Sequence, residues 1–280
     1  MANLINLSDC LEQIKTLFEN AIRVNGDAGK KNVINSKHVI NILHEVVKSS
    51  LVENGINPGL INPRLGETRG EVKLAGFVKL KTQDICVFPN HITPTSEKLN
   101  FHGLHYGKTD GFGELFSEHI LTINLRSQLS ALSANIDTMY ERTYAEPLNL
   151  HRRLPKMVIG EVYMIAAREL DNREVVNNNV VYAPVTTAIA KSIETYINGF
   201  SALNNRLNQR DDDFKYERVA LVIADFSQNP VKVYNNIEDL KADSLLPQSS
   251  NVSLENMTFD NFIVDLIRIY ERRFGTGKLS

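Results

Sequence analysis

The feature that most constrains the fold of this chain is a predicted strand that leads through a polar spacer into a predicted helix. Residues 119–125 alternate between apolar and polar side chains, a pattern typical of a largely buried strand. The strand ends in side chains that form hydrogen bonds, namely Asn124, Arg126, Ser127 and Gln128. A polar group at a strand's end, ahead of a long helix, is a common position for a functional site. Any chemistry is therefore expected near this point.

Two helices are predicted before the first strand. Asp9 and Glu12 resemble a capping pair for a first helix, which is expected to end near Asn25 and Gly26. A lysine-containing link then leads to Ser36, a candidate cap for a second helix. That second helix is expected to bury one apolar stripe, made of Val39, Leu43, Val46, Val47 and Leu51.

Strands and helices alternate in the second half of the chain. A helix is predicted from Asn135 to Leu150, although Pro147 is expected to kink or interrupt it. Further strands are predicted at 157–167, 217–226 and 231–234, and further helices at 186–200 and 258–274. This order predicts a single α/β domain over residues 1–280, a mixed sheet flanked by helices. The N-terminal helices, about residues 1–55, are expected to pack on this core or to extend it.

Composition narrows the class of protein. The 280 residues carry a formal net charge of −2, so the chain has no overall basic footprint for nucleic acid, although a fold can gather its Lys and Arg on one face. Cys10 and Cys86 lack the spacing of a metal site or a disulfide framework, which fits a reducing compartment. No stretch approaches the length of a membrane span and no signal peptide is evident, so a cytoplasmic protein without membrane contact is expected.

Asp84 is the unusual residue of the first strand region. The segment GFVKLKTQDICVFP predicts a strand, a kink and a second strand that ends at Pro89. Asp84 opens the apolar run of the second strand, where a carboxylate must be exposed, paired or bound to a metal. A metal ligand and an ordinary strand-entry aspartate are both compatible with this position.

Two polar loops offer further candidates. Arg64 and Arg69 lie in a Gly-rich loop over 54–76 and can reach phosphates, although a mixed-charge loop is also typical of plain solvated surface. The irregular segment 90–118 contains His102 and His105, which could bind metal or phosphate but lack an obvious third ligand. GKTDGFGE in this segment does not have the spacing of a phosphate-binding loop.

GFVKLKTQDICVF followed by INLRSQLSALSANIDTMYERTYAE resembles the PD-(D/E)xK nucleases, and among them a branch of type II restriction endonucleases. In that branch an aspartate opens one core strand. The next core strand carries the motif acidic-x-Lys-Ser-Gln, in which x is any residue. An Asn-containing spacer and a helix with an Arg-Thr element follow. Asp84 matches the aspartate, Ser127 and Gln128 match the Ser-Gln pair, and Arg142 with Thr143 matches the Arg-Thr element. The resemblance covers residues 76–150.

At two positions this sequence differs from the motif of the nuclease family. Asn124 stands where the family has an acidic metal ligand, and Arg126 stands where it has a lysine. The resemblance implies that Asp84 holds Mg²⁺ or Mn²⁺, that Asn124 completes or tunes its ligand shell, and that Gln128 orients neighbouring groups. Arg126 would face the scissile phosphate, but it cannot act as a base. An additional carboxylate would strengthen metal binding, for which the candidates are Asp110, Glu118 and Glu161.

The resemblance implies a Mg²⁺-dependent, site-specific endonuclease for double-stranded DNA. Such an enzyme is expected to be a homodimer, because a symmetric site is cut on both strands, and to act beside a cognate DNA methyltransferase. Base contacts are expected from the loop 90–118 or from the Asn-rich loop 172–179. DNA contacts are expected from a basic set, Arg64, Arg69, Lys81, His102, His105 and Lys108. A non-catalytic nucleic-acid-binding or interaction protein on the same scaffold remains the alternative.

Overall fold

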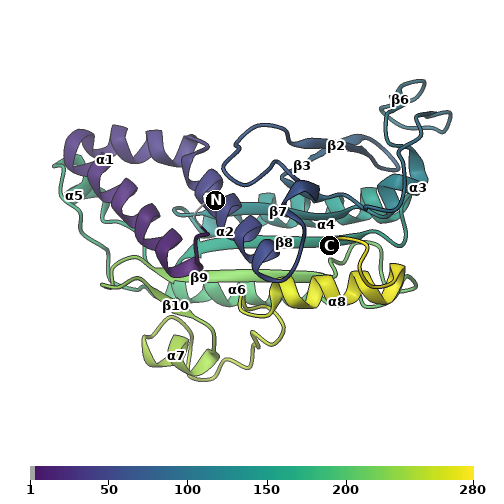
Figure 1. The fold of residues 1–280 in the computed structure, drawn as a ribbon. Coiled ribbons are helices and arrows are strands. Elements are labelled where there is room, and N and C mark those ends of the chain that lie inside the picture. Colours follow the sequence, from purple (N-terminus) through teal and green to yellow (C-terminus); the bar gives the residue numbers. More distant parts are fainter. Residues whose placement is uncertain (1–3) are drawn as a thin grey trace.

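A mixed sheet of six strands, in the order β1-β4-β7-β8-β9-β10, forms the middle layer of the protein (Figure 1). The computed structural model describes residues 4–280. The strands are β1 (Ile61–Asn62), β4 (Ile85–Val87), β7 (Leu121–Gln128), β8 (Val158–Ala166), β9 (Arg218–Asp225) and β10 (Lys232–Tyr234). β7, β8 and β9 are parallel, whereas β4 and β10 pair antiparallel with β7 and β9. The predicted α/β class with a mixed sheet is confirmed.

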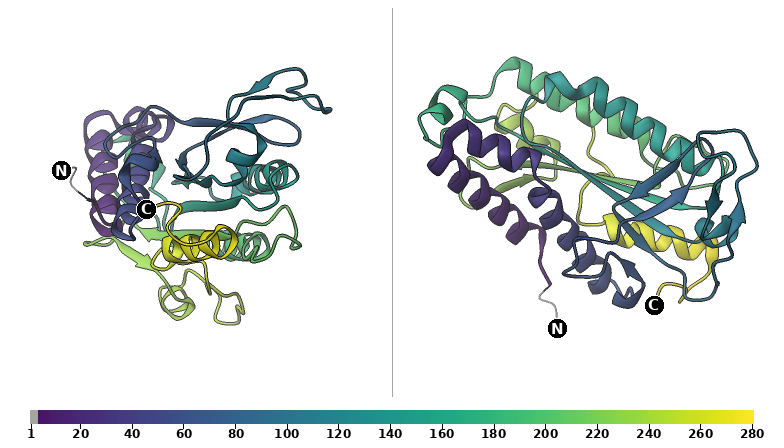
Figure 2. Two further views of the ribbon diagram at one scale, coloured as in Figure 1. Left: turned by 45° about the vertical axis from the view of Figure 1, so that its right-hand side comes forward. Right: turned by 90° about the horizontal axis from the view of Figure 1, so that it is seen from above.

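Helices cover both faces of this sheet (Figure 2). One face packs against α1 (Leu7–Asn35), α2 (His38–Glu53) and α8 (Phe262–Phe274). The other face packs against α4 (Ile136–His151) and α6 (Thr187–Leu203), and near them lie α3 (Gly113–Glu118) and α7 (Ile237–Ala242). β8 is buried along its whole length, because helices lie on both of its faces, which explains its near-continuous apolar sequence. No helix within residues 4–280 is long and apolar enough to cross a membrane.

Two small hairpins project beside the β1–β4 side of the sheet (Figures 1 and 2). The first pairs β2 (Val72–Ala75) with β3 (Leu80–Gln83), and β3 leads directly into β4. The second pairs β5 (Glu97–Lys98) with β6 (Thr109–Asp110). The sequence predicted a loop at β2 and an irregular segment at β5 and β6, because strands this short leave little periodic signal. Of the hairpin strands, only β3 lies in a predicted strand. The break between β3 and β4 falls at Asp84, where a kink was predicted.

The helix ends agree with the sequence predictions in part. The predicted break near Asn25 and Gly26 is confirmed, because both residues leave the helical conformation and Gly26 takes a φ of +50°, but the predicted link after it is helical and completes α1 to Asn35. A side chain at Gly26 would meet the carbonyl oxygen of Val175 at 2.7 Å, so glycine also allows α5 (Asn172–Val176) to approach. α2 begins at His38 with Lys37 rather than Ser36 at its cap. α4 runs through Pro147 without interruption and ends at His151.

Candidate active site

Asp84, Asn124 and Glu161 form a row across three neighbouring strands. Ile85 pairs with Ile123, so the preceding residue, Asp84, lies opposite Asn124, and Asn124 in turn pairs in register with Glu161 on β8. The Asp84 amide donates to Asn124 Oδ1 over 3.4 Å, and Asp84 Oδ2 accepts a bond from the Leu125 amide over 2.8 Å. Strand alternation points Asn124 and Glu161 to the face that α4 covers, since their strand neighbours Ile123, Leu125 and Val162 pack on the opposite face.

Arg126 joins two glutamates from different elements. It lies two residues beyond Asn124 on β7, and therefore on the same face of the sheet. Its Nη1 bonds to Glu161 Oε1, and its Nη2 bonds to Glu146 Oε2 of α4. The Glu161 side chain is fully buried and that of Glu146 is 2% exposed, whereas that of Arg126 is 19% exposed. The guanidinium thus offsets the cost of placing two carboxylates between the sheet and α4.

Lys81 and Gln83 of β3 complete the group. Lys81 Nζ lies 3.3 Å from Glu146 Oε2, and its side chain is 31% exposed, which makes it the most accessible cation of the group. Gln83 is fully buried, and its Oε1 accepts bonds from Asn124 Nδ2 and Thr122 Oγ1, each over 3.0 Å. We call the residues Lys81, Gln83, Asp84, Asn124, Arg126, Glu146 and Glu161 the polar cluster.

Two carboxyl groups of the polar cluster, those of Asp84 and Glu161, have raised pKa values. Burial raises the pKa of Asp84 to about 6, although the Leu125 amide and Arg126 act in the opposite direction. Burial raises the pKa of Glu161 to about 8, with Glu146 adding to the effect and Arg126 opposing it. Burial would lower the pKa of Arg126, yet Glu161 and Glu146 hold it well above its usual value. Shifted carboxyl groups of this kind concentrate at functional sites, because ordinary folding does not require them.

The oxygen atoms of the polar cluster suit a hard divalent cation. Glu161 Oε2 is buried without a hydrogen-bond partner, and Asp84 Oδ1 accepts no hydrogen bond from the described residues. Mg²⁺ is commonly held by one or two carboxylates, and waters and substrate phosphates fill its remaining positions. Residues 4–280 contain no set of three or more His, Cys, Asp or Glu side chains arranged around one metal position. Asp84 and Glu161 are therefore the cluster residues that keep a carboxylate oxygen free of hydrogen bonds and could help to hold such a cation.

The structure separates two of the predicted site residues from this cluster. Gln128 lies at the end of β7 and its Nε2 donates to the carbonyl oxygen of Ser130, so it stabilises the turn that follows the strand. Asp110 lies on β6, and its Oδ2 is 2.8 Å from Arg153 Nη2. Asp110 therefore neutralises a buried arginine and belongs to the packing of the β5–β6 hairpin.

The residues predicted to contact DNA differ in the solvent exposure of their side chains. Arg64, Arg69, His102 and Lys108 are exposed, and Lys81 is partly exposed beside the cluster. The prediction for His105 was wrong, because His105 is only 1% exposed and its Nε2 lies 2.6 Å from the Gly76 carbonyl oxygen. His105 instead links the loop over 99–108 to the β2–β3 hairpin.

The sequence reasoning missed two residues of the polar cluster, Gln83 and Glu146. The signal for Glu146 was present in the helical spacing, because Thr143, Glu146, Pro147 and Leu150 form one buried stripe of α4. A glutamate within such a stripe needs a partner, and the partner, Arg126, lies twenty residues earlier in the chain.

Comparisons with protein-family models, with curated proteins and with solved structures find no match to this chain. The resemblance to nucleases therefore depends on the residues and on their arrangement alone.

Proposed function

We propose that the protein is a divalent-metal-dependent endonuclease for double-stranded DNA, with the polar cluster as its active site. The observation that carries this proposal is the row Asp84, Asn124 and Glu161. It supplies a second carboxylate, Glu161, one strand beyond Asn124, the position at which this chain lacks the acid of the nuclease pattern. The order of the elements also supports it: an aspartate opens β4, the next sheet strand β7 carries the remaining motif, and a spacer leads to α4.

Each residue of the polar cluster has a role in this proposal. Asp84 and Glu161 hold Mg²⁺, which when bound activates a water and neutralises charge on the phosphate. Asn124, between them, contributes a neutral oxygen and fixes the Asp84 backbone. Arg126 positions Glu161 and Glu146 through its two ion pairs. Lys81 is the cation with access to solvent, and it faces the phosphate of the substrate.

Cleavage of plasmid DNA with Mg²⁺ or Mn²⁺ tests the proposal. Asp84→Asn and Glu161→Gln keep the shape of each side chain but remove its charge, and we expect each to lower the cleavage rate by roughly a hundredfold or more. Asp212→Asn provides the matched control, because Asp212 is exposed and its only ion pair within residues 4–280, to Lys215, spans 3.7 Å. Wild-type cleavage rates in Asp84→Asn would overturn the assignment.

One observation favours a second candidate function, a DNA-binding protein that does not cut. Arg126 already pairs with both glutamates, so the cluster is held together without any metal ion. This candidate predicts salt-dependent DNA binding that survives Asp84→Asn and no cleavage with any divalent ion. In the catalytic case, a two-fold assembly and a neighbouring methyltransferase are expected, since a symmetric site is cut on both strands and the host DNA needs protection.

A further inference from the structure

The two hairpins beside the polar cluster are fastened to each other and to α4. Arg153 donates to the Ala75 carbonyl oxygen over 2.7 Å and pairs with Glu97 and Asp110 of the second hairpin. Its guanidinium carbon also lies 5.8 Å from the centre of the Phe101 ring. Arg153 is 7% exposed, so these contacts form a buried anchor. We call residues 72–83 and 97–110 together the arm.

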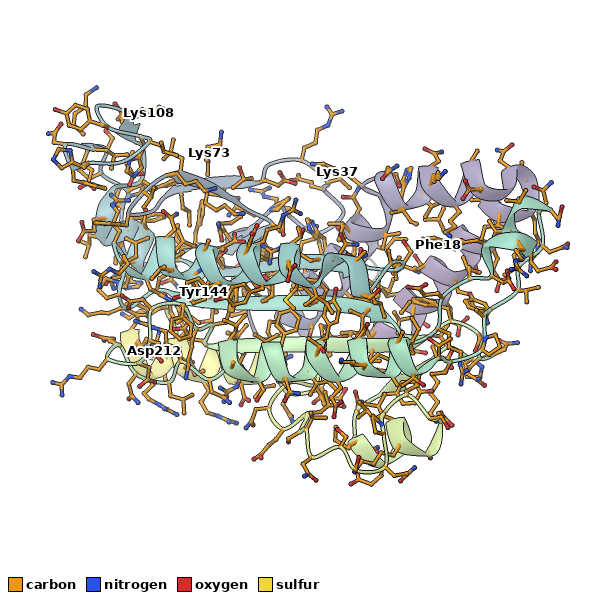
Figure 3. The ribbon with its side chains drawn as sticks, turned by 180° about the vertical axis from the view of Figure 1, so that it is seen from behind. Phe18, Lys37, Lys73, Lys108, Tyr144 and Asp212 are labelled. Carbon is orange, nitrogen blue, oxygen red and sulfur yellow. The ribbon has the colours of Figure 1, made fainter. Side chains whose placement is uncertain are left out.

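The charge of the arm is opposite to that of the whole chain. It contains five lysines, Lys73, Lys79, Lys81, Lys98 and Lys108, and two acidic residues. Both acidic residues, Glu97 and Asp110, are paired with Arg153. Lys73, Lys79, Lys98 and Lys108 are exposed and have no ion pair to any described residue, and Figure 3 shows Lys73 and Lys108 pointing away from the body of the protein. A chain with a net charge of −2 thus concentrates unpaired positive charge on one projection.

The arm also exposes a cluster of large apolar side chains. Thirteen large hydrophobic residues are exposed in the described part of the chain, and four of them lie on the arm. Their exposed fractions are 46% for Phe77, 45% for Val78, 75% for Leu104 and 66% for Tyr106. The Leu104 amide donates to the Val78 carbonyl oxygen over 2.7 Å, so these residues come from two segments held side by side. Burying such side chains in a partner is favourable, whereas leaving them in water is not.

Positive charge around protruding apolar side chains is the surface chemistry of proteins that wedge DNA base pairs apart. Lysines bind phosphates without regard to sequence, and Phe or Leu side chains insert between base steps and kink the duplex. We propose that the arm binds double-stranded DNA, with its lysines on the phosphates and with Leu104 and Tyr106 inserted at a base step. This inference shares with the proposed function the premise that the partner is DNA, but it does not require that the DNA is cut.

A binding measurement in Ca²⁺, without Mg²⁺ or Mn²⁺, separates this inference from catalysis. The probe is a fluorescent random-sequence duplex, and a second duplex carries 2-aminopurine at scattered adenine positions to report unstacking. For Lys73→Ala with Lys108→Ala, we expect the slope of log K against log salt to become shallower by about 1 to 2. For Leu104→Ala with Tyr106→Ala, we expect roughly tenfold weaker binding, an unchanged slope and loss of the 2-aminopurine signal.

The controls carry the same changes away from the arm. Lys191→Ala on α6 matches the lysine variants, and Leu207→Ala matches the apolar variant, because Leu207 is 38% exposed. Arm variants that bind DNA and change its fluorescence as these controls do would overturn the inference. An apolar variant that alters the oligomeric state and leaves DNA binding unchanged would also overturn it, and would assign the patch to a second copy. If the wild type binds through the arm but never cleaves in Mg²⁺ or Mn²⁺, only the catalytic proposal fails.

Discussion

Arg126 is the residue on which the polar cluster depends. One guanidinium neutralises two buried glutamates from β8 and α4, and no other described cation pairs with Glu161. A buried charge that loses its partner costs far more free energy than the intact pair contributes, because the remaining charge is poorly solvated. Arg126 therefore stabilises the folded state chiefly by offsetting the free-energy cost of burying the Glu146 and Glu161 carboxylates.

Arg126→Met is expected to lower the free energy of unfolding by about 3 kcal/mol at alkaline pH, where a buried Glu161 carboxylate is left without its partner. The loss should be smaller at neutral pH, because Glu161, whose pKa is raised to about 8, can take up a proton there. Adding Glu161→Gln should recover part of the loss, since it removes one unpaired charge. Urea unfolding measures each step, and Arg142→Met on the exposed side of α4 is the control, expected to change stability by less than about 0.5 kcal/mol. Simple additivity of the two cluster variants would contradict this account.

α4 contributes one residue to the polar cluster and another that holds the β2–β3 hairpin in place. Glu146 reaches the polar cluster, and three residues later Asn149 holds the β2–β3 hairpin. Asn149 Oδ1 accepts bonds from the amides of Val78 and Lys79 over 2.8 and 3.1 Å, and its Nδ2 donates to the Lys79 carbonyl oxygen over 3.1 Å. The hairpin that presents Lys81 is thereby fixed relative to the site.

Asn149→Ala is expected to release this hairpin without unfolding the protein. Three hydrogen bonds disappear, and the amides of Val78 and Lys79 become free to exchange, while the sheet and the other helices keep their contacts. Hydrogen exchange followed by mass spectrometry should show faster exchange in peptides over 72–83, and the free energy of unfolding should fall by about 1–2 kcal/mol. Asn20→Ala on the exposed side of α1 is the control. Unchanged exchange over 72–83 would show that the hairpin is held by other contacts.

The elements that the sequence predicted well are those with their own periodic signal. β8 and β9 read as apolar runs, and the buried stripe of α2 follows from its spacing. β1 and α7 lacked such a signal, because β1 is defined by pairing with β4 and α7 is short. In the site, Asp84 and Asn124 were linked through the resemblance to the nuclease pattern, and the antiparallel register of β4 and β7 places them opposite each other. Glu146 could not be linked, because only the packing of α4 on the sheet brings it to Arg126.

A buried network of charged groups at the start of β9 connects the sheet with the helices on both of its faces. Near the start of β9, Glu217 is fully buried and gathers groups from α4, α8 and the segment after α6. Its Oε1 lies 2.7 Å from Arg273 Nη1 and 3.2 Å from Arg206 Nη1. Its Oε2 accepts a bond from the Ile159 amide over 2.7 Å and lies 3.4 Å from His151 Nε2. These contacts tie the two helix layers to the sheet.

The charge on Glu217 links this network to the stability of the protein in acid. Burial alone would raise its pKa, but His151, Arg273 and Arg206 lower it from 4.5 to about 2. Since the folded state holds the proton less tightly than the unfolded chain, the stabilisation is fully present above pH 4.5 and disappears as the pH falls toward 2. A difference of this size corresponds to about 3 kcal/mol.

Glu217→Gln is expected to destabilise the protein by about 3–5 kcal/mol at neutral pH, because Arg206 and Arg273 lose their buried counter-charge. The gap between wild type and variant should then narrow as the pH falls below 4.5, since the wild type loses the same charge by protonation. Chemical unfolding at a series of pH values measures the gap, with Glu255→Gln at an exposed position as the control. A gap that stays constant from neutral pH into acid would mean that the Glu217 side chain acts through its shape and hydrogen bonds rather than through its charge.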